Sequence, residues 1–196
     1  QGMELVLASA SPRRREFLRR LGLSFLEEPA RVDEALLPGE PAARAARRLA
    51  GLKARAVAKS HAGAAVLAAD TLVVLDEHIL GKPRDLHQAR DMLELLAGRW
   101  HQVVTGYCLM LDGSEHCGLA TTSVRFRRPR PGEIEAYLHS GEPQGKAGAY
   151  AVQGLGAALV EQVEGSYTNV VGLPLAEVVE LMLERGIIEP DPEARP

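Results

Sequence analysis

The stretch LVLASASPRRREFL, residues 5–18, changes character at its two serines. The apolar residues before them are typical of a buried strand. Apolar residues recur at helical spacing from Phe17 onward, after Pro12, which suits the first turn of a helix. We therefore predict a strand, a turn and a helix. The free N–H groups at the helix start, with the Ser9 and Ser11 hydroxyls and the arginines, favour an anion such as a phosphate chain. The alternative is a surface helix with solvated arginines.

The most apolar run of the chain is AVLAADTLVVL, residues 65–75, which we predict to be the central strand. Asp70 stands in its middle. A carboxylate in such a place is costly unless it is hydrogen-bonded, paired or bound to a metal, so Asp70 is the first candidate for chemistry. We expect it to face, across a groove, the cationic pocket that begins at Ser9. The alternative is that Asp70 marks a strand end and caps a neighbouring loop.

Helical and strand patterns alternate along the rest of the chain, which predicts an α/β fold. Helices are expected over about 41–59 and 85–97 and from Pro131 and Pro174, and strands over about 24–27, 79–83, 100–111, 114–127 and 157–163. Thr105-Gly106 is expected to interrupt the first long strand. Residues 142–154 are small, polar and rich in glycine, and we expect a loop whose backbone approaches a ligand closely.

Two lysines stand out among the basic residues. Most charges of the helix expected over 41–59 should face solvent, but Lys53 is adjacent to the apolar face and is a candidate for pointing inward. Lys82 precedes a proline in a rigid loop, where its ammonium could reach the same phosphates.

Composition narrows the class of protein. At 196 residues, 46% of them hydrophobic, the chain suits one compact domain or two lobes that share a cleft. The first 60 residues hold 12 Lys and Arg against 7 Asp and Glu, and the remainder holds 11 against 19. This asymmetry favours a pocket with a polyphosphate on one wall and a cation on the other. A sequence pI near 6.1 argues against nucleic-acid binding, because such proteins are more often basic overall.

The expected location of the protein determines the expected redox state of its two cysteines. No apolar run approaches the roughly 20 residues of a membrane span, and no secretory signal is evident, so we expect a cytoplasmic protein with no membrane partner. A turn at Asp112-Gly113 would bring Cys108 and Cys117 face to face across a hairpin. In a reducing compartment we expect two free thiols, with oxidation in vitro as a hypothesis. The six histidines lack ligand spacing and are expected to be structural or on the surface.

Eight stretches, taken together, resemble the Maf family of nucleotide pyrophosphatases. They are residues 8–14 (ASASPRR), 33–34 (DE), 53–54 (KA), 69–71 (ADT), 81–83 (GKP), 105–106 (TG), 146–154 (KAGAYAVQG) and 165–174 (GSYTNVVGLP). The resemblance implies an elongated, two-lobed mixed sheet flanked by helices, similar to inosine triphosphate pyrophosphatases, with a cleft between the lobes. It also implies a homodimer. Where the family usually has Asp before the loop lysine, this chain has Gly145.

The resemblance further implies hydrolysis of a nucleoside triphosphate to the monophosphate and pyrophosphate. The motifs are similar to those of the branch that prefers dTTP and UTP over 7-methyl-GTP, which implies house-cleaning of the nucleotide pool, modified pyrimidine nucleotides included. One alternative is a nucleotide-binding regulator of septum formation and cell division with little turnover. Another is an enzyme of the same fold for damaged purine nucleotides. Intact Asp70 and Glu34 favour an enzyme, because a mere binder would lose little with Asn or Ala there.

The expected chemistry assigns a role to each charged residue. Attack at the α-phosphorus requires a water nucleophile, a cation and donors that hold the leaving pyrophosphate. Asp70 is expected to accept the proton of that water, or to hold a metal together with Glu34. Mg²⁺ or Mn²⁺ is expected because carboxylates and phosphates suit these ions. The residues expected to neutralise and bind the triphosphate are Ser9, Arg14, Lys53 and Lys82.

Base selectivity is expected from a separate set. By resemblance, Arg13, Thr71 and Gln153 line the base pocket. The amide of Gln153 can donate and accept at once, which matches the imide edge of uracil or thymine. The domain is expected to span 3–188, with a disordered tail at 189–196.

Overall fold

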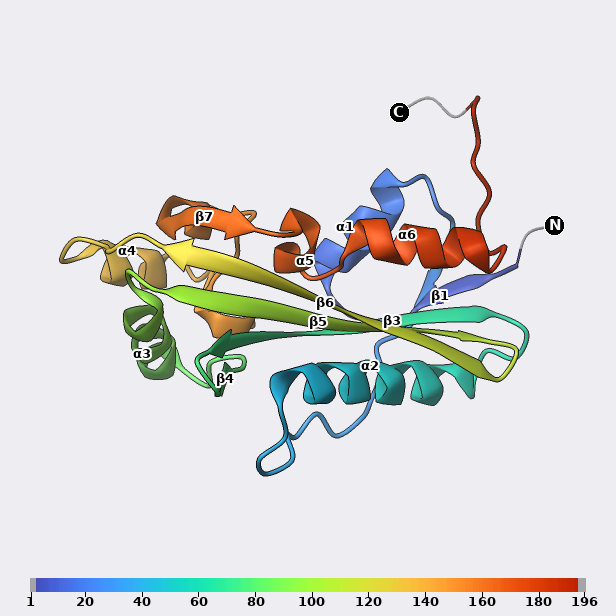
Figure 1. Cartoon of the computed structure of the whole chain (residues 1–196), viewed down its shortest axis with the longest axis horizontal. Helices are drawn as coiled ribbons and strands as arrows, with labels where there is room; N and C mark the ends of the chain where they lie inside the picture. Colours follow the sequence, from blue (N-terminus) through green and yellow to red (C-terminus); the bar gives the residue numbers. More distant parts are fainter. Residues whose placement is uncertain (1–2, 194–196) are drawn as a thin grey trace.

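One mixed sheet runs the length of the molecule (Figure 1). The computed structural model describes residues 3–193, and within them seven strands form this sheet. They are β1 (Leu5–Leu7), β2 (Leu26–Glu27), β3 (Ala65–Leu75), β4 (His78–Leu80), β5 (Trp100–Leu111), β6 (Ser114–Phe126) and β7 (Val160–Glu164). The helices are α1 (Pro12–Arg20), α2 (Ala42–Ala58), α3 (Leu86–Leu96), α4 (Glu133–His139), α5 (Tyr167–Val171) and α6 (Leu175–Glu184), with 3-10 turns η1 (Ala147–Ala149) and η2 (Leu155–Leu159).

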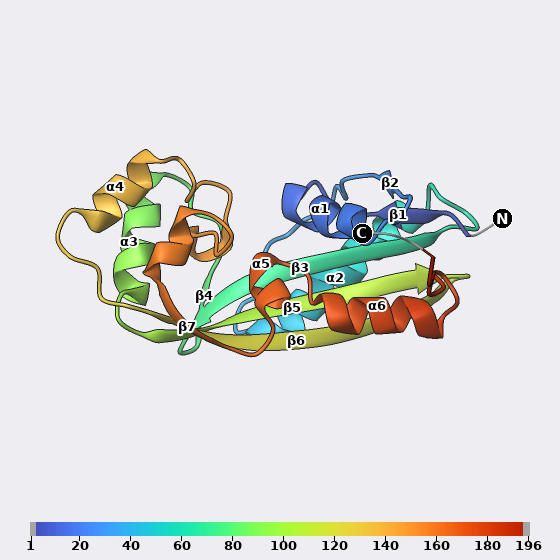
Figure 2. The same ribbon diagram turned by 90° about the horizontal axis from the view of Figure 1, so that it is seen from above.

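The helices divide the molecule into two lobes. In the larger lobe α2 covers one face of the sheet, and α1, α5 and α6 cover the other (Figure 1). Figure 2 shows the smaller lobe, in which α3 and α4 gather at one end of the long strands. The elongated, two-lobed α/β fold expected from the sequence is therefore confirmed. Among the described residues, none of the helices combines the length and the apolar character that crossing a bilayer requires.

Strand β3 is the central strand of the sheet. The strands follow the order β2-β1-β3-β5-β6-β7, and β4 pairs with the far end of β3. β1 is parallel to β3 at residues 65–67, and β4 is antiparallel to it at residues 73–75. Both lie on the edge of β3 opposite β5. Between them, at residues 68–72, that edge has no partner strand within the described chain.

The core lies on both faces of this strand. Side chains alternate across a sheet, and those at odd positions of β3 join a large apolar core with α1, α6 and the small lobe, represented by Leu67 and Met182. Those at even positions pack against α2, represented by Val66 and Ala54. Full burial of such side chains contributes about 1.5–3 kcal/mol each for the larger ones. The same alternation decides which way Asp70 and its neighbour point.

Gly106 corrects one prediction. Thr105-Gly106 does not interrupt a strand, because β5 runs unbroken through both residues and pairs Asp70 with Gly106 and Thr71 with Thr105. A Cβ at position 106 would lie 2.4 Å from the carbonyl oxygen of Ala46 in α2. The glycine therefore lets α2 approach the sheet closely, and it does not break the strand.

Smaller differences occur at element ends. The fourth helix begins at Glu133, after Gly132, and not at Pro131. Residues 157–159 belong to the 3-10 turn η2, so β7 begins at Val160. Helix α5 was not expected. Residues 189–193 form no helix or strand, and the end of the tail, residues 194–196, lies outside the described residues.

The two cysteines are bonded to each other. The register pairs Cys108 with Cys117, with their Cα atoms 4.1 Å apart, and their sulfur atoms form a disulfide. The expected pairing across the hairpin is confirmed, but the expectation of two free thiols is wrong. Residues so close in a hairpin can be bridged without backbone movement.

Candidate active site

A cleft of about 880 Å³ opens where β3 lacks a neighbour. Segments from both lobes line it, including the turn after β1 and the loop before η2. All the residues predicted for the site line this one cleft: Ser9, Arg13, Arg14, Glu34, Lys53, Asp70, Thr71, Lys82 and Gln153. Residues spread over most of the chain are thus brought together as expected.

The turn after β1 is built by its serines. Ser11 caps α1, since its hydroxyl oxygen accepts a hydrogen bond from the Arg14 backbone N–H at 3.3 Å. The Ser9 hydroxyl oxygen accepts from the Ser11 N–H at 3.0 Å. These bonds satisfy donors that a helix start leaves free. They also fix the direction in which Arg13 and Arg14 leave the helix.

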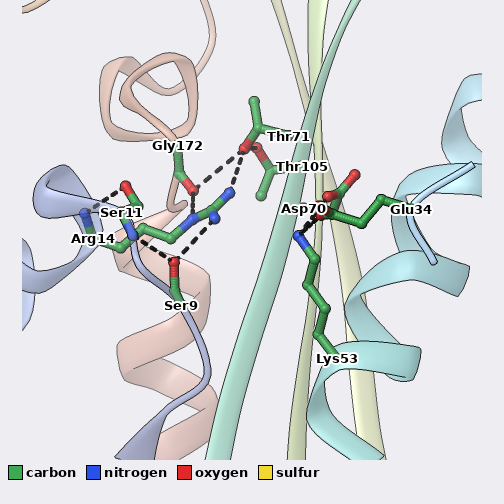
Figure 3. Close-up of polar contacts among 9 residues, drawn as sticks. All are labelled: Ser9, Ser11, Arg14, Glu34, Lys53, Asp70, Thr71, Thr105 and Gly172. Carbon is green, nitrogen blue, oxygen red and sulfur yellow. Dashed lines mark hydrogen bonds and ion pairs between the residues drawn. The ribbon is translucent and has the colours of Figure 1, made fainter. Parts of the chain in front are cut away.

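Within the part of the chain that the structure describes, the hydrogen bonds of the Arg14 guanidinium all go to neutral oxygens (Figure 3). Its Nε donates to the carbonyl of Gly172 at 2.8 Å, and its Nη2 donates to Thr71 Oγ1 at 3.0 Å. Nη1 lies 3.5 Å from Ser9 Oγ. Burial lowers the pKa of Arg14 to about 10, so the side chain stays charged at neutral pH. Its positive charge remains uncompensated by these contacts and is available to an anion.

Lys53 ties two carboxylates together. Its Nζ lies 2.8 Å from Asp70 Oδ1 and 2.6 Å from Glu34 Oε1. The lysine and Asp70 side chains are only 12% and 11% exposed, which confirms that Lys53 points inward. Burial alone would raise the pKa of Glu34, but the hydrogen bond and charge of Lys53 outweigh it, so that the pKa is lowered. The other Asp70 oxygen, Oδ2, is buried and has no partner among the described residues.

Asp70 and Arg14 lie on opposite faces of β3. Asp70 shares the α2 face with Gly106, whereas its neighbour Thr71 shares the other face with Thr105, and Thr71 Oγ1 lies 2.8 Å from Thr105 Oγ1. Figure 3 shows Lys53 and Arg14 approaching the strand from its two sides. Both faces nevertheless line one cleft, because the edge of β3 is open there. Asp70 thus faces the cationic turn around a strand edge, and not across one surface of the sheet.

The residues predicted for base selectivity have different surroundings. Gln153 is exposed at the cleft, in the loop before η2. Arg13 donates from Nε to the carbonyl of Val171 at 3.2 Å, and burial lowers its pKa. The Thr71 hydroxyl is already occupied by Arg14 and Thr105. Thr71 therefore orients Arg14, while its contact with a base stays a prediction.

Lys82 connects the site to the small lobe. It lines the cleft, and its charge helps Lys53 to lower the pKa of Glu34 against the effect of burial, which raises it. The preceding carbonyl, of Gly81, accepts a hydrogen bond from the N–H of Gly148 at 3.1 Å. The lysine is thus placed beside the loop that carries Gln153.

Two contributors were missed by the sequence interpretation. Gly172 supplies its carbonyl to Arg14 from a backbone with φ of 135°, which favours glycine. Glu142 lines the cleft and binds the backbone of its own loop. Gly172 stood in a recognised motif and Glu142 in the quoted loop, but a carbonyl acceptor and a loop anchor leave no spacing pattern to detect.

The carboxylates fit a hard cation. Within the described residues no group of three or more His, Cys, Asp or Glu side chains is arranged to hold a metal. Asp70 and Glu34 converge on the Lys53 ammonium, and Asp70 Oδ2 is buried without a partner among the described residues. Mg²⁺ commonly takes one or two protein carboxylates and fills its other positions with water and substrate phosphates. The donor set therefore suits Mg²⁺ or Mn²⁺ and does not suit zinc.

Comparison with known proteins points in one direction. A family model described as Maf-like protein matches residues 4–185. A relative from Anaeromyxobacter sp., named dTTP/UTP pyrophosphatase, is 51% identical over 187 residues, covering 93% of this chain and 89% of the relative. A relative of the same name from Moorella thermoacetica is 51% identical over 186 residues, covering 94% and 96%.

A solved structure is similar in fold alone. The HAM1 protein from Coxiella burnetii matches with a TM-score of 0.54 and 19% identity, covering 93% of this chain and 99% of that one. The similarity extends over both lobes and supports the elongated mixed sheet.

Proposed function

This chain belongs to the Maf family, and we propose that it is a nucleoside triphosphate pyrophosphatase that hydrolyses dTTP and UTP. The products are the nucleoside monophosphate and pyrophosphate, and the role is house-cleaning of the nucleotide pool. Relatives that share about half of its residues over most of both chains carry the name dTTP/UTP pyrophosphatase. The proposal transfers that activity to this chain.

One structural observation carries the proposal to particular residues. Asp70 Oδ2 is buried and has no partner within residues 3–193, 11% of the side chain is exposed, and the cleft beside it also holds Arg14. A buried polar atom without a partner is costly unless a ligand supplies one. We assign Asp70 as the acceptor of a proton from the attacking water or as a metal ligand. Either role places the reacting phosphorus at the open edge of β3.

The other charged residues receive roles that match their contacts. Arg14, the Ser9 hydroxyl and Lys82 bind the phosphates and stabilise the leaving pyrophosphate. Lys53 holds Asp70 and Glu34 in register with each other. Arg13 and Gln153 contact the base from the other end of the cleft.

A divalent cation is part of the proposal. Asp70 and Glu34 would hold Mg²⁺ or Mn²⁺, which would neutralise phosphate charge and lower the pKa of a bound water. The chain's own residues then bind the phosphates, orient the base and accept the proton. We also propose a cytoplasmic homodimer, which the family resemblance implies; light scattering of the purified protein tests the oligomeric state.

The experiment is pyrophosphate release from a panel of nucleoside triphosphates with Mg²⁺ or Mn²⁺. We expect dTTP and UTP to be cleaved, and Asp70→Asn to lose about two or more orders of magnitude in rate, the scale of removing an acid–base group. Asp91→Asn, on the exposed surface of α3, is the matched control and should retain activity. Equal activity of wild type and Asp70→Asn would show that Asp70 is misassigned. Triphosphate binding without turnover by the wild type would favour the regulator.

A further inference from the structure

Glu142 binds the backbone of the loop that carries Gln153. Its Oε1 accepts a hydrogen bond from the N–H of Leu155 at 2.8 Å, and its Oε2 accepts from the N–H of Gly156 at 2.9 Å. Oε2 also accepts a hydrogen bond from the Tyr137 hydroxyl in α4. Hydrogen bonds to a charged acceptor are stronger than those between neutral groups. The loop is therefore fastened to the small lobe by a single carboxylate.

Tyr137 extends this fastening to the other side of Gln153. Its hydroxyl oxygen accepts from the N–H of Ala151 at 3.1 Å while its proton goes to Glu142. Burial and the bond to Glu142 raise the pKa of Tyr137, so the hydroxyl keeps its proton. Gln153 thus lies between two fixed points, Ala151 before it and Leu155 after it.

The glycines of the loop are required by this arrangement. A Cβ at Gly154 would lie 1.7 Å from Glu142 Oε1, and a Cβ at Gly156 would lie 2.7 Å from the Tyr137 hydroxyl oxygen. Neither position tolerates a side chain while Glu142 and Tyr137 stay where they are. The Glu142 carboxylate can lie this close to the loop because Gly154 and Gly156 have no side chains. Its position in turn requires glycine at both places.

Glu142 also affects the pKa of Arg13, which is proposed to contact the base from the other side. It lines the cleft, and its charge raises the pKa of Arg13 against the larger effect of burial. None of its hydrogen bonds reaches the Lys53–Asp70 pair. Its influence is therefore confined to the end of the cleft where the base is expected.

We propose that Glu142 is a positioning residue that holds Gln153 over the cleft and thereby sets the preference for uracil and thymine bases. The proposal rests on the assignment of this cleft to dTTP and UTP hydrolysis. Glu142 contacts no reacting group, so its loss should weaken base recognition and leave the chemical step in place.

The test compares Glu142→Gln with Glu133→Gln. Gln has nearly the same shape as Glu, but its amide replaces one acceptor oxygen with an NH₂ donor. In one orientation this donor faces the N–H of Leu155. In the other it faces the N–H of Gly156 and the Tyr137 hydroxyl. Glu133 is the control because it also binds a backbone N–H of the same lobe, that of Arg130, and two nitrogens of Arg127, but lies outside the cleft.

Kinetics separate positioning from simple stability. For Glu142→Gln we expect the KM for dTTP to rise about tenfold, kcat to stay near wild type, and the preference for dTTP over dCTP to fall about tenfold, the scale of one such hydrogen bond. Tyr137→Phe, which keeps both amide bonds to Glu142, should show a smaller change of the same kind. Glu133→Gln should lower the Tm without changing KM or base preference.

Two outcomes would overturn the proposal. In one, Glu142→Gln lowers the Tm as Glu133→Gln does but keeps the wild-type KM and preference. In the other, the amides of residues 151–156 exchange hydrogen equally fast in wild type and Glu142→Gln. The exchange measurement needs no activity. If the wild type fails to release pyrophosphate, the proposed function fails while the exchange result still decides whether Glu142 holds the loop.

Discussion

The two faces of β3 treat a buried cation in opposite ways. On the face of Thr71, the Arg14 guanidinium is bound by a carbonyl and two hydroxyls, none of them charged. On the face of Asp70, the Lys53 ammonium is bound by two carboxylates. Thr71 and Asp70 are adjacent in β3, yet the Arg14 charge on one face is bound by neutral groups and the Lys53 charge on the other is bound by two carboxylates.

The difference shows how one strand can provide sites for two kinds of ligand group, a phosphate beside Arg14 and a cation or a water beside Asp70. Neutral acceptors orient Arg14 without cancelling its charge, so its attraction is kept for a phosphate. The two carboxylates around Lys53 leave a net negative charge and an unpartnered Asp70 oxygen for a cation or a water. The faces meet at the open edge of β3, where the phosphates and the cation of the proposed triphosphate–metal complex would both be within reach.

Arg14→Lys should have the largest effect on activity among variants of the Thr71 face. A lysine keeps the charge but cannot reach three acceptors in the fixed geometry of a guanidinium. We expect the KM for dTTP to rise about 10- to 100-fold, the equivalent of one or two lost charge-assisted bonds. Steady-state kinetics check this, with Arg19→Lys on the exposed side of α1 as control. A normal KM in Arg14→Lys would mean that charge alone suffices.

Thr71→Val tests the neutral binding of Arg14 with a smaller expected effect. It removes one neutral acceptor from Arg14 and the closer partner of the Thr105 hydroxyl, which keeps a 3.5 Å contact with the Asn169 carbonyl. We expect the KM to rise by up to about tenfold. Thr71→Ser keeps the hydroxyl and should stay close to wild type. If Thr71→Val changed only the preference among bases, the hydroxyl would belong to base recognition and not to Arg14.

His101 shows what burial alone does to a cation without a counter-ion. It is 2% exposed, its Nε2 lies 2.7 Å from the Tyr150 hydroxyl, and burial lowers its pKa to about 4. Arg14 experiences the same effect but starts from a much higher pKa, and therefore keeps its charge. His101 is neutral at pH 7, so His101→Gln should leave pyrophosphate release unchanged there.

The predicted effect of His101 is on stability in acid. As pH falls below about 6.5, the unfolded chain binds a proton that folded His101 refuses until about pH 4. The free energy of unfolding should therefore fall across this window, by up to about 3 kcal/mol. Denaturant titrations at pH 7 and pH 4.5 should show a smaller fall for His101→Gln than for wild type. Equal falls in the two proteins would contradict the burial of a neutral imidazole.

Much of the fold follows from local patterns. Residues 65–75 form β3 as predicted, because an apolar run rich in Val and Leu has few other places in a protein of this size. The inward direction of Lys53 could be predicted because it is adjacent to the apolar face of α2. These features depend on sequence neighbours alone.

What escaped prediction depends on distant partners. The sequence alone predicts an interruption at Gly106, since the close approach of Ala46 comes from another element. The hairpin register of Cys108 and Cys117 could be predicted from Asp112-Gly113, but the bonding state could not, because compartment and not geometry guided the expectation. The alternation of side chains along β3 can be predicted from the sequence, but the face on which Asp70 lies depends on the position of α2.

The candidate site shows the same division. Local sequence patterns and motif resemblance together gathered nine side chains that share one cleft, because each carries its own chemistry. The Gly172 carbonyl and the loop contacts of Glu142 depend on backbone geometry, which a residue type does not announce.

The gap between β1 and β4 has a consequence for inhibitor chemistry. A compound that satisfies both Arg14 and Asp70 must turn around the rim of a single strand, so a straight, planar scaffold can engage only one of them. Selective compounds should therefore be built on a short, rigid elbow, with an anionic group on one arm and, for the proposed metal, a chelating group on the other.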